Sequence, residues 1–534
     1  MIAPFLHLDE TFTSDEGAYA LQVAVLEDGH WEYAYEAEPQ DPEGRWFPLV
    51  NSSRSERGWY PYVQHPSVPM LLLVSTRVLG RVAGLHAPGM LGALGAAVAA
   101  WLLAAEIAPA LRRAAFWLVA VSPAAVNGYI IWAHAPMAAV AGLALVAAVR
   151  VARQEEGPNV LVLLLCLVAG VLLRSEGLLF AVAVSGGLAV GCRRFSWRRW
   201  AAVPSLCLAL VGLVAVAEKS WISAIVGASY QPQVLRDRTA GDVAPSGGSF
   251  FDWALGRVQG AWHSVFQGPY EDPRGTVLVA LALGLVAFAV WALRRQGSGW
   301  RRDAELALVG AVVVYAVRVL DSPSESMTGL FAAWPIALLG VGVVPLAVVK
   351  RAPVVTVTVV AFTILVLVTQ YRVGGGLEWG GRFLSPLTAP LAVMTAVGVD
   401  HVWRNLLGRR VLPIVCALAV VPLVTGLVVL RSTREVSGRI VDEVTAGPRL
   451  VVTSSPALPR AAWRTYPDVA WMKVPPDELG EALAALRSGG VREVTVRTPS
   501  DADARAFDAF PRVRDVTDPD ARQFGWRTLH LSAE

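Results

Sequence analysis

The run VLPIVCALAVVPLVTGLVVL, residues 411–430, contains no charged residue and is long enough to cross a lipid bilayer. A transmembrane α-helix needs about 20 predominantly apolar residues. Similar runs recur along most of the chain, in which 54% of the residues are hydrophobic and only 17% are charged. These runs are continuous, whereas the strands of a membrane barrel would alternate with a period of two. The sequence therefore predicts an α-helical polytopic membrane protein.

Thirteen apolar segments correspond to about 11–13 transmembrane helices. They lie at 67–84, 88–108, 114–131, 134–150, 159–173, 177–192, 200–217, 276–293, 304–320, 327–348, 353–370, 385–403 and 411–430. Positive charge in short loops indicates the cytoplasmic side of a membrane. Arg and Lys cluster in four such loops, around 193–199, 294–302, 350–351 and 404–410. The six segments between 67 and 192 would then place the first loop in the cytoplasm. A first loop outside the membrane requires an odd number of membrane-spanning segments before the basic residues at 193–199. We therefore expect that one segment between residues 67 and 131 is wrongly split or missed.

The chain divides into three predicted parts. Residues 1–66 form a first extracytoplasmic loop, and residues 67–430 form the transmembrane domain with an external loop at 218–275. Residues 431–534 form a small soluble α/β domain outside the membrane, because charge rises there and short strand and helix patterns alternate. Its strands are expected at 450–453, 491–496 and 527–531, and its helices at 477–487 and 501–507. The first loop is rich in Trp and Tyr, so we expect it to lie against the lipid headgroups.

Two adjacent carboxylates, Asp15 and Glu16, stand in the first loop within the sequence TSDEGAY, residues 13–19. A carboxylate at the membrane surface can take a proton from an acceptor hydroxyl, or it can hold a metal ion. The same pair also suits the first turn of a short helix with Ser14 as its N-cap, where the helix dipole favours acidic residues. Spacing alone leaves both interpretations open.

Four motifs occur in a characteristic order. They are DEGAY at 15–19, HPSVPML at 65–71, LLRSEGLL at 172–179 and GGRFLSPLTAP at 380–390. Together they resemble the GT-C superfamily of membrane glycosyltransferases, and in particular its protein O-mannosyltransferase and aminoarabinose-transferase branches. The resemblance covers about residues 1–430.

The resemblance implies an enzyme that moves a single sugar from a polyprenyl-phosphate donor to an extracytoplasmic acceptor, with inversion at the anomeric carbon. The acceptor would be a protein, a glycan or a lipid, and the active site would face outside the cytoplasmic membrane. Asp15 would be the base, and Glu16 would support it or bind the acceptor. Arg382 and Arg174 would neutralise the donor phosphate, because guanidinium groups bind phosphate bidentately. Further substrate-binding candidates are Tyr19, His65, Trp379 and Glu378.

Each candidate also has a structural interpretation. Arg382 fits a headgroup anchor, Arg174 and Glu176 fit an internal ion pair, and His65 fits an interfacial aromatic residue. Two departures from the family pattern matter. Where some branches carry a second carboxylate, this chain has Trp132-Ala133-His134, so His134 is the available substitute. The transmembrane helix expected before the Asp-Glu loop is not in the sequence, which indicates an upstream start or a truncated copy.

Two other functions compete with the transferase: a transporter or flippase of lipid-linked saccharides, and an inactive truncated homologue. A flippase should carry several charges within its apolar segments, and those present are few (Arg77, Glu106 and Arg318). No phosphate-binding loop, dinucleotide fingerprint or zinc-ligand spacing is found. The sequence predicts no nucleic-acid partner and no certain cofactor, while a divalent metal ion stays an option.

Overall fold

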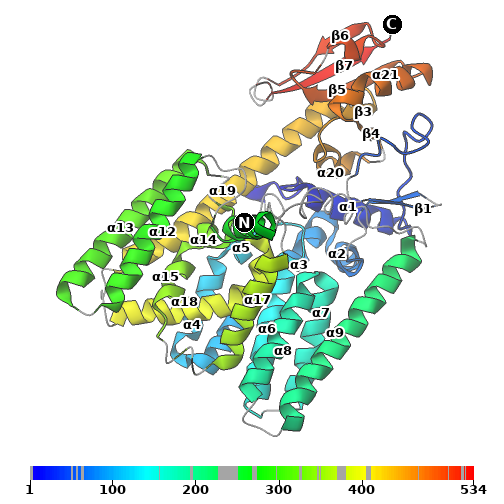
Figure 1. The fold of residues 1–534 in the computed structure, drawn as a ribbon. Helices are drawn as coiled ribbons and strands as arrows, with labels where there is room; N and C mark the ends of the chain where they lie inside the picture. Colours follow the sequence, from blue (N-terminus) through cyan, green and yellow to red (C-terminus); the bar gives the residue numbers. More distant parts are fainter. Residues whose placement is uncertain are drawn as a thin grey trace. The chain divides into compact units, whose positions relative to one another are not determined.

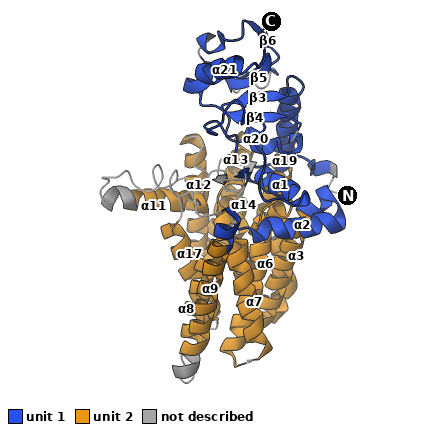
Figure 2. Cartoon of the chain, turned by 90° about the vertical axis from the view of Figure 1, so that its right-hand side faces the viewer, with its two compact units in different colours: residues 1–85, 221–234, 430–534 blue, residues 86–220, 235–429 orange. Residues whose placement is uncertain are grey.

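Two compact units make up the fold (Figure 2). Unit 1 takes residues 1–85, 221–234 and 430–534, and unit 2 takes residues 86–220 and 235–429. The predicted first loop and C-terminal domain thus belong to one unit. The computed structural model describes residues 4–49, 52–55, 58–61, 65–154, 157–192, 197–226, 250–266, 273–295, 297–323, 327–345, 348, 350, 352–369, 380–404, 411–466, 468–502, 504–518, 522 and 525–533.

The C-terminal part of unit 1 is a five-stranded sheet in the order β4-β3-β5-β7-β6 (Figure 1). Its strands are β3 (Leu450–Thr453), β4 (Ala470–Lys473), β5 (Glu493–Pro499), β6 (Arg512–Asp515) and β7 (Trp526–Ser532). Strand β3 pairs in parallel with β4 and β5, and the remaining pairs are antiparallel. The predicted small α/β domain is confirmed. The prediction missed β4 and β6, and β6 is exposed along its whole length, so it carries no pattern of alternating burial.

Short helices connect these strands. They are α20 (Leu458–Ala461), η7 (Trp463–Thr465), η8 (Pro476–Glu478), α21 (Leu479–Ser488) and η9 (Ala504–Phe507). Helix α21 buries Leu479, Leu483 and Leu486 along one face, which is the amphipathic spacing of a helix packed on a core. Helix α21 lies where the sequence predicts a helix at 477–487. The helix expected at 501–507 is only the short 3-10 turn η9.

The N-terminal part of unit 1 contains η1 (Pro4–Leu6), α1 (Ser14–Glu27), β1 (Ser53–Ser55), β2 (Gly58–Tyr60) and α2 (Ser67–Leu79). Five of the first-loop Trp and Tyr side chains are buried, although the sequence predicts that they lie against lipid headgroups: Tyr33, Tyr35, Trp46, Trp59 and Tyr60. Phe47 stacks on Trp59 with ring centroids 3.8 Å apart, and Tyr33 meets Tyr466 of the C-terminal part at 5.1 Å. The expectation was wrong because these rings find partners across unit 1 and become its core.

Unit 2 is helical. Its elements, with those that continue into unit 1, are α3 (Arg81–Ile107), η2 (Pro109–Leu111), α4 (Arg112–Ala120), α5 (Pro123–Asn127), α6 (His134–Ala152), α7 (Pro158–Leu173), α8 (Glu176–Cys192), α9 (Trp197–Val226), α11 (Phe250–Val265), α12 (Pro273–Arg294), α13 (Ser298–Asp321), α14 (Leu330–Ala333), α15 (Pro335–Val343), α17 (Pro353–Thr369), η4 (Arg382–Leu387), α18 (Thr388–Val402) and α19 (Val411–Thr445). Small residues allow close packing: a Cβ on Gly398 of α18 would lie 2.0 Å from the carbonyl oxygen of Gly340 in α15.

Six helices among the described residues are long and apolar enough to cross a membrane. They are Arg81–Ile107, His134–Ala152, Ala201–Val226, Pro273–Arg294, Arg382–Val402 and Pro413–Thr445. Four further apolar helices have 10–17 residues. The predicted polytopic α-helical class is therefore confirmed.

The first two predicted segments, 67–84 and 88–108, correspond to helices α2 and α3, which are separated at Gly80. Helix α2 has 13 residues, so it is about 20 Å long, which is shorter than the roughly 30 Å hydrocarbon core. The next stretch, 112–130, is broken at Ser122 but returns along α3. Arg112 lies over the Trp101 ring at its start, and a Cβ on Gly89 would lie 2.8 Å from the Gly128 carbonyl oxygen near its end.

Candidate active site

Helix α1 begins with a reciprocal capping box that includes Glu16. The Thr13 hydroxyl accepts the backbone N–H of Glu16, and the Glu16 carboxylate accepts the N–H of Thr13 at 2.9 Å and of Phe12 at 2.5 Å. The N-cap is thus Thr13 rather than the expected Ser14. Such a box satisfies backbone donors that the first turn of a helix leaves without partners.

The other oxygen of Glu16 accepts a hydrogen bond from Arg434 of α19 at 3.0 Å. Both side chains are completely buried. A buried charge is tolerated when an opposite charge and hydrogen bonds compensate it, and both are present here. We therefore assign Glu16 a structural role, because a carboxylate enclosed in this way does not face an acceptor.

Asp15 forms the second ion pair of this helix, with Arg460 of α20 at 3.2 Å. The Arg460 side chain is only 5% exposed, whereas that of Asp15 is 32% exposed. Gly17 makes this contact possible: a Cβ there would lie 1.7 Å from the Arg460 carbonyl oxygen. The sequence Asp-Glu-Gly thus docks α1 on α20 and leaves one carboxylate partly accessible. That carboxylate belongs to Asp15.

The other first-loop candidates differ in accessibility. Tyr19 is 1% exposed within α1, so its ring belongs to the core of unit 1. His65 is half-buried immediately before α2 and has a positive φ of 50°. The remaining substrate-binding candidates, Glu378 and Trp379, lie outside the described residues.

In unit 2, two consecutive glycines position Arg382. Gly380 and Gly381 have φ values of +59° and +61°, a left-handed conformation that side chains strain. A Cβ on Gly381 would also lie 2.6 Å from the carbonyl oxygen of Ser264. This turn leads directly into η4, which begins at Arg382 and continues with Phe383.

The structure brings Arg174 and Arg382 to the same aromatic ring. The Arg174 guanidinium lies 5.7 Å from the centre of the Phe383 ring, and the Arg382 guanidinium lies 5.1 Å from it. Arg174 also forms two hydrogen bonds of 3.0 Å to Glu176, so the expected ion pair exists. Arg174 and Arg382 are more than 200 positions apart in the sequence. Two cations and one carboxylate leave a net positive charge that favours an anion.

Two aromatic residues complete this cluster. The Arg382 guanidinium also lies 5.4 Å from the Trp132 ring centre, and the His134 ring meets Trp132 at 4.7 Å. Both rings are buried. The indole N–H of Trp132 has no hydrogen-bond partner within the described residues, whereas the His134 ring interacts with the backbone of Arg382. A buried polar group without a partner is costly, so the Trp132 N–H is suited to a ligand that supplies one. The sequence identified His134 as a departure from a pattern but gave no sign of this contact.

Metal binding has no visible site. In the ranges that the structure describes, no three His, Cys, Asp or Glu side chains gather in a group that could hold a metal ion.

Comparisons with known proteins found similar solved structures, two of which are described here. No family model matches the chain, and no curated protein matches it. The chain is similar to the crystal structure of ArnT from Cupriavidus metallidurans bound to undecaprenyl phosphate, at 14% identity and a TM-score of 0.48, over 99% of this chain and 95% of that one. It is also similar to the apo structure of the same protein, at 13% identity and a TM-score of 0.39, over 94% of each chain.

ArnT is an aminoarabinose transferase of the GT-C superfamily, which the four sequence motifs resemble. At these identities and TM-scores no residue role is transferred from ArnT. The roles assigned to residues of this chain rest on their own contacts.

Proposed function

We propose that this chain is a membrane glycosyltransferase that moves one sugar from a polyprenyl-phosphate donor to an extracytoplasmic acceptor, with inversion at the anomeric carbon. The observation that carries the proposal is the meeting of Arg174 and Arg382 at Phe383. A donor of this class has a phosphate next to a long apolar chain. It therefore needs fixed cations beside apolar helices, and the cluster in unit 2 combines the two.

The proposed step is a single displacement. The oxygen of the acceptor hydroxyl attacks the anomeric carbon and forms the new glycosidic bond, while its proton passes to the Asp15 carboxylate. The bond between the anomeric carbon and the phosphate oxygen breaks, and its electron pair leaves with the polyprenyl phosphate. Arg174 and Arg382 stabilise the negative charge that develops on this leaving group. Glu16 holds α1 in place and takes no proton.

We place unit 1 outside the cytoplasmic membrane. In this orientation the basic residues at 193–199 lie in the cytoplasm, the side on which short loops rich in Arg and Lys are found. The acceptor would reach Asp15 from the outside.

A flippase for lipid-linked saccharides is the competing function. Such a protein should present charges along a path between its helices. Glu106 of α3 is instead paired with Arg150 at 2.9 Å and with Arg153 at 2.7 Å, and Glu176 is paired with Arg174. These ion pairs favour the transferase.

The testing experiment measures transfer of a labelled sugar from polyprenyl phosphate in membranes that contain the wild-type chain or Asp15→Asn. We expect the variant to lose labelled product, because the amide cannot accept the proton, while its amount in the membrane is unchanged. Asp9→Asn is the matched control: it makes the same change in the same loop at a carboxylate that pairs with Arg464. If Asp15→Asn transfers as much sugar as the wild type, Asp15 is not the base of the reaction.

A second variant tests whether Arg382 acts on the binding of the donor or on the binding of the acceptor. Arg382→Ala should raise the KM for the donor far more than the KM for the acceptor, because it removes a phosphate contact. Equal effects on both would contradict a phosphate role for Arg382. Movement of a lipid-linked saccharide between leaflets without any change in its mass would favour the flippase.

A further inference from the structure

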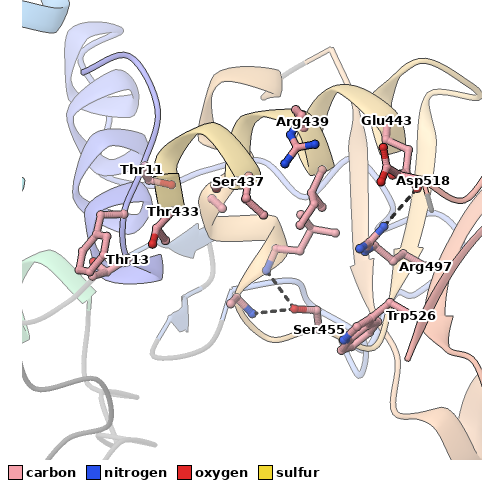
Figure 3. Close-up of a pocket in the computed structure, with 16 residues that line it drawn as sticks. Thr11, Thr13, Thr433, Ser437, Arg439, Glu443, Ser455, Arg497, Asp518 and Trp526 are labelled. Atoms are coloured by element: carbon pink, nitrogen blue, oxygen red, sulfur yellow. Dashed lines mark hydrogen bonds and ion pairs between the residues drawn. The ribbon is translucent and has the colours of Figure 1, made fainter. Parts of the chain in front are cut away.

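A cavity of about 640 Å³ lies within unit 1, and the proposed chemical step uses none of its lining residues. Its walls come from the loop before α1, the C-terminal half of α19, the segment from β3 to α20, and the strands β5 and β7 (Figure 3). This volume is within the range of roughly 300–1,000 Å³ that is typical of small-molecule sites.

The lining is mainly apolar, with aliphatic residues such as Val436 and Ile440, and it also carries aromatic, hydroxyl and charged groups. Trp526 and Phe12 provide aromatic surface. Five hydroxyl groups line the cavity: Thr11, Thr13, Thr433, Ser437 and Ser455. The charged residues are two arginines, Arg439 and Arg497, and two carboxylates, Glu443 and Asp518.

The charges at the β5 wall are already compensated. Arg497 is 5% exposed, and it donates hydrogen bonds to Glu443 at 3.2 Å and to the Thr528 hydroxyl at 2.7 Å. Asp518 also lies near this guanidinium, on the same side as Glu443 (Figure 3). An anionic ligand would meet two carboxylates here, and a cationic ligand would meet two arginines. A neutral ligand with many hydroxyl groups meets neither obstacle.

We infer that this cavity binds a neutral saccharide, and that this saccharide is the acceptor of the transfer, an assignment that rests on the proposed function. A sugar ring has an apolar C–H face, which packs on an aromatic ring such as Trp526. Its hydroxyls both donate and accept hydrogen bonds, so they can pair with the carboxylates, guanidinium groups and hydroxyls of this lining.

Two of the segments that line the cavity, the start of α1 and the helix α20, also carry the two residues of the Asp15 ion pair. Thr13 lines the cavity and caps α1, and Asp15 follows two residues later. Leu458 and Ala461 line the cavity from α20, which also carries Arg460, the partner of Asp15. Asp15 itself is not part of the lining. A saccharide held in the cavity would therefore extend its terminal sugar past α20 to reach Asp15.

Saturation-transfer difference NMR on the full chain tests this assignment without any donor. The probes are three neutral trisaccharides, mannotriose, arabinotriose and maltotriose, each at about 10 mM, so that a Kd near 1 mM is still detected. The protein is held in a detergent without a sugar headgroup, because a maltoside would compete for the site. We expect at least one probe to receive saturation from the wild-type protein.

Four variants locate the binding. Trp526→Ala and Ser437→Leu should abolish the signal, since the first removes the stacking ring and the second fills the cavity. Trp526→Phe keeps an aromatic face and should retain it. Ser432→Leu makes the same change on α19 at an exposed position outside the lining and should also retain it. Absence of signal for all three probes, or a signal that Trp526→Ala and Ser437→Leu leave unchanged, would overturn the saccharide site.

The outcome for the site and the outcome for the transferase are separable. Labelled transfer that proceeds although no trisaccharide binds would reject the saccharide acceptor and keep the enzyme. Trisaccharide binding with no transfer in the wild-type chain would reject the proposed function and, with it, the role of the saccharide as acceptor. Asp15→Asn should bind the trisaccharide as the wild type does, because Asp15 lies outside the cavity.

Discussion

Replacing Glu16 by Gln should strongly destabilise unit 1, although the change removes almost no volume. The amide can still accept the backbone N–H groups of Phe12 and Thr13, so the capping box largely survives. What disappears is the charge opposite Arg434, whose side chain is completely buried. Leaving such a charge without its counterion costs about 3–5 kcal/mol. A second substitution, Arg434→Met, removes the stranded charge and should restore most of this loss.

The assay is thermal unfolding of the full chain in detergent, followed by tryptophan fluorescence, for the wild type, both single variants and the double variant. We expect each single variant to have a clearly lower Tm and the double variant to have a Tm close to that of the wild type. The same four proteins are then tested for transfer. An active double variant would confirm that Glu16 is structural. A stable double variant without activity would indicate that Glu16 takes part in the transfer reaction. A Tm of Glu16→Gln equal to that of the wild type would refute the ion-pair reasoning itself.

Three further predictions concern other parts of the fold. Gly17→Ala should lower the free energy of unfolding by about 1–3 kcal/mol, because the new methyl group overlaps the Arg460 carbonyl; the matching Ala18→Gly substitution tests whether backbone freedom alone explains the change. Burial raises the pKa of Glu36 to about 7, so its contribution to stability is complete below pH 4.5 and is lost as the pH rises through 7. Glu36→Gln should therefore raise Tm at pH 8 but not at pH 4, and a pH-independent difference would contradict this. Gly381→Ala should weaken donor use as Arg382→Ala does, because its φ of +61° cannot be kept without strain; donor kinetics equal to the wild type would show that Arg382 does not depend on this turn.

Helix positions were largely predictable, because apolar composition records contact with lipid and core. The end of the first segment was not predictable, because apolar residues continue beyond Leu79, where helix α2 ends. This helix buries Val68 and Leu72 but exposes Val74 and Val78, and hydropathy does not record where a helix stops. The prediction for the first-loop aromatic residues was wrong because Trp and Tyr are common both at a membrane interface and in a protein core. The strand β6 was not predicted, because all of its residues are exposed and its sequence therefore shows no alternation of apolar and polar residues.

The candidate site was predictable only where its signals are local. Thr13 and Glu16 have the spacing of a capping box, so the sequence contained the evidence for the structural role of Glu16. Its partner Arg434 is 418 residues away, and no local rule connects the two. The meeting of Arg174 and Arg382 at Phe383 likewise follows from tertiary packing. The motifs contain both arginines, but only the structure shows that the two guanidinium groups lie at the same ring.

The ion pairs of the first loop also constrain how the protein matures. Asp9, Asp15 and Glu16 find their partners at Arg464, Arg460 and Arg434, residues that the ribosome adds last. The loop that carries the proposed base must therefore wait, with its acidic side chains solvated, until almost the whole chain has been synthesised and inserted. A chain that stops before residue 434 would contain every one of the four family motifs and still lack a folded first loop. On the proposed function, a chain that ends before residue 434 would therefore carry Asp15 without the contacts that hold its helix in place.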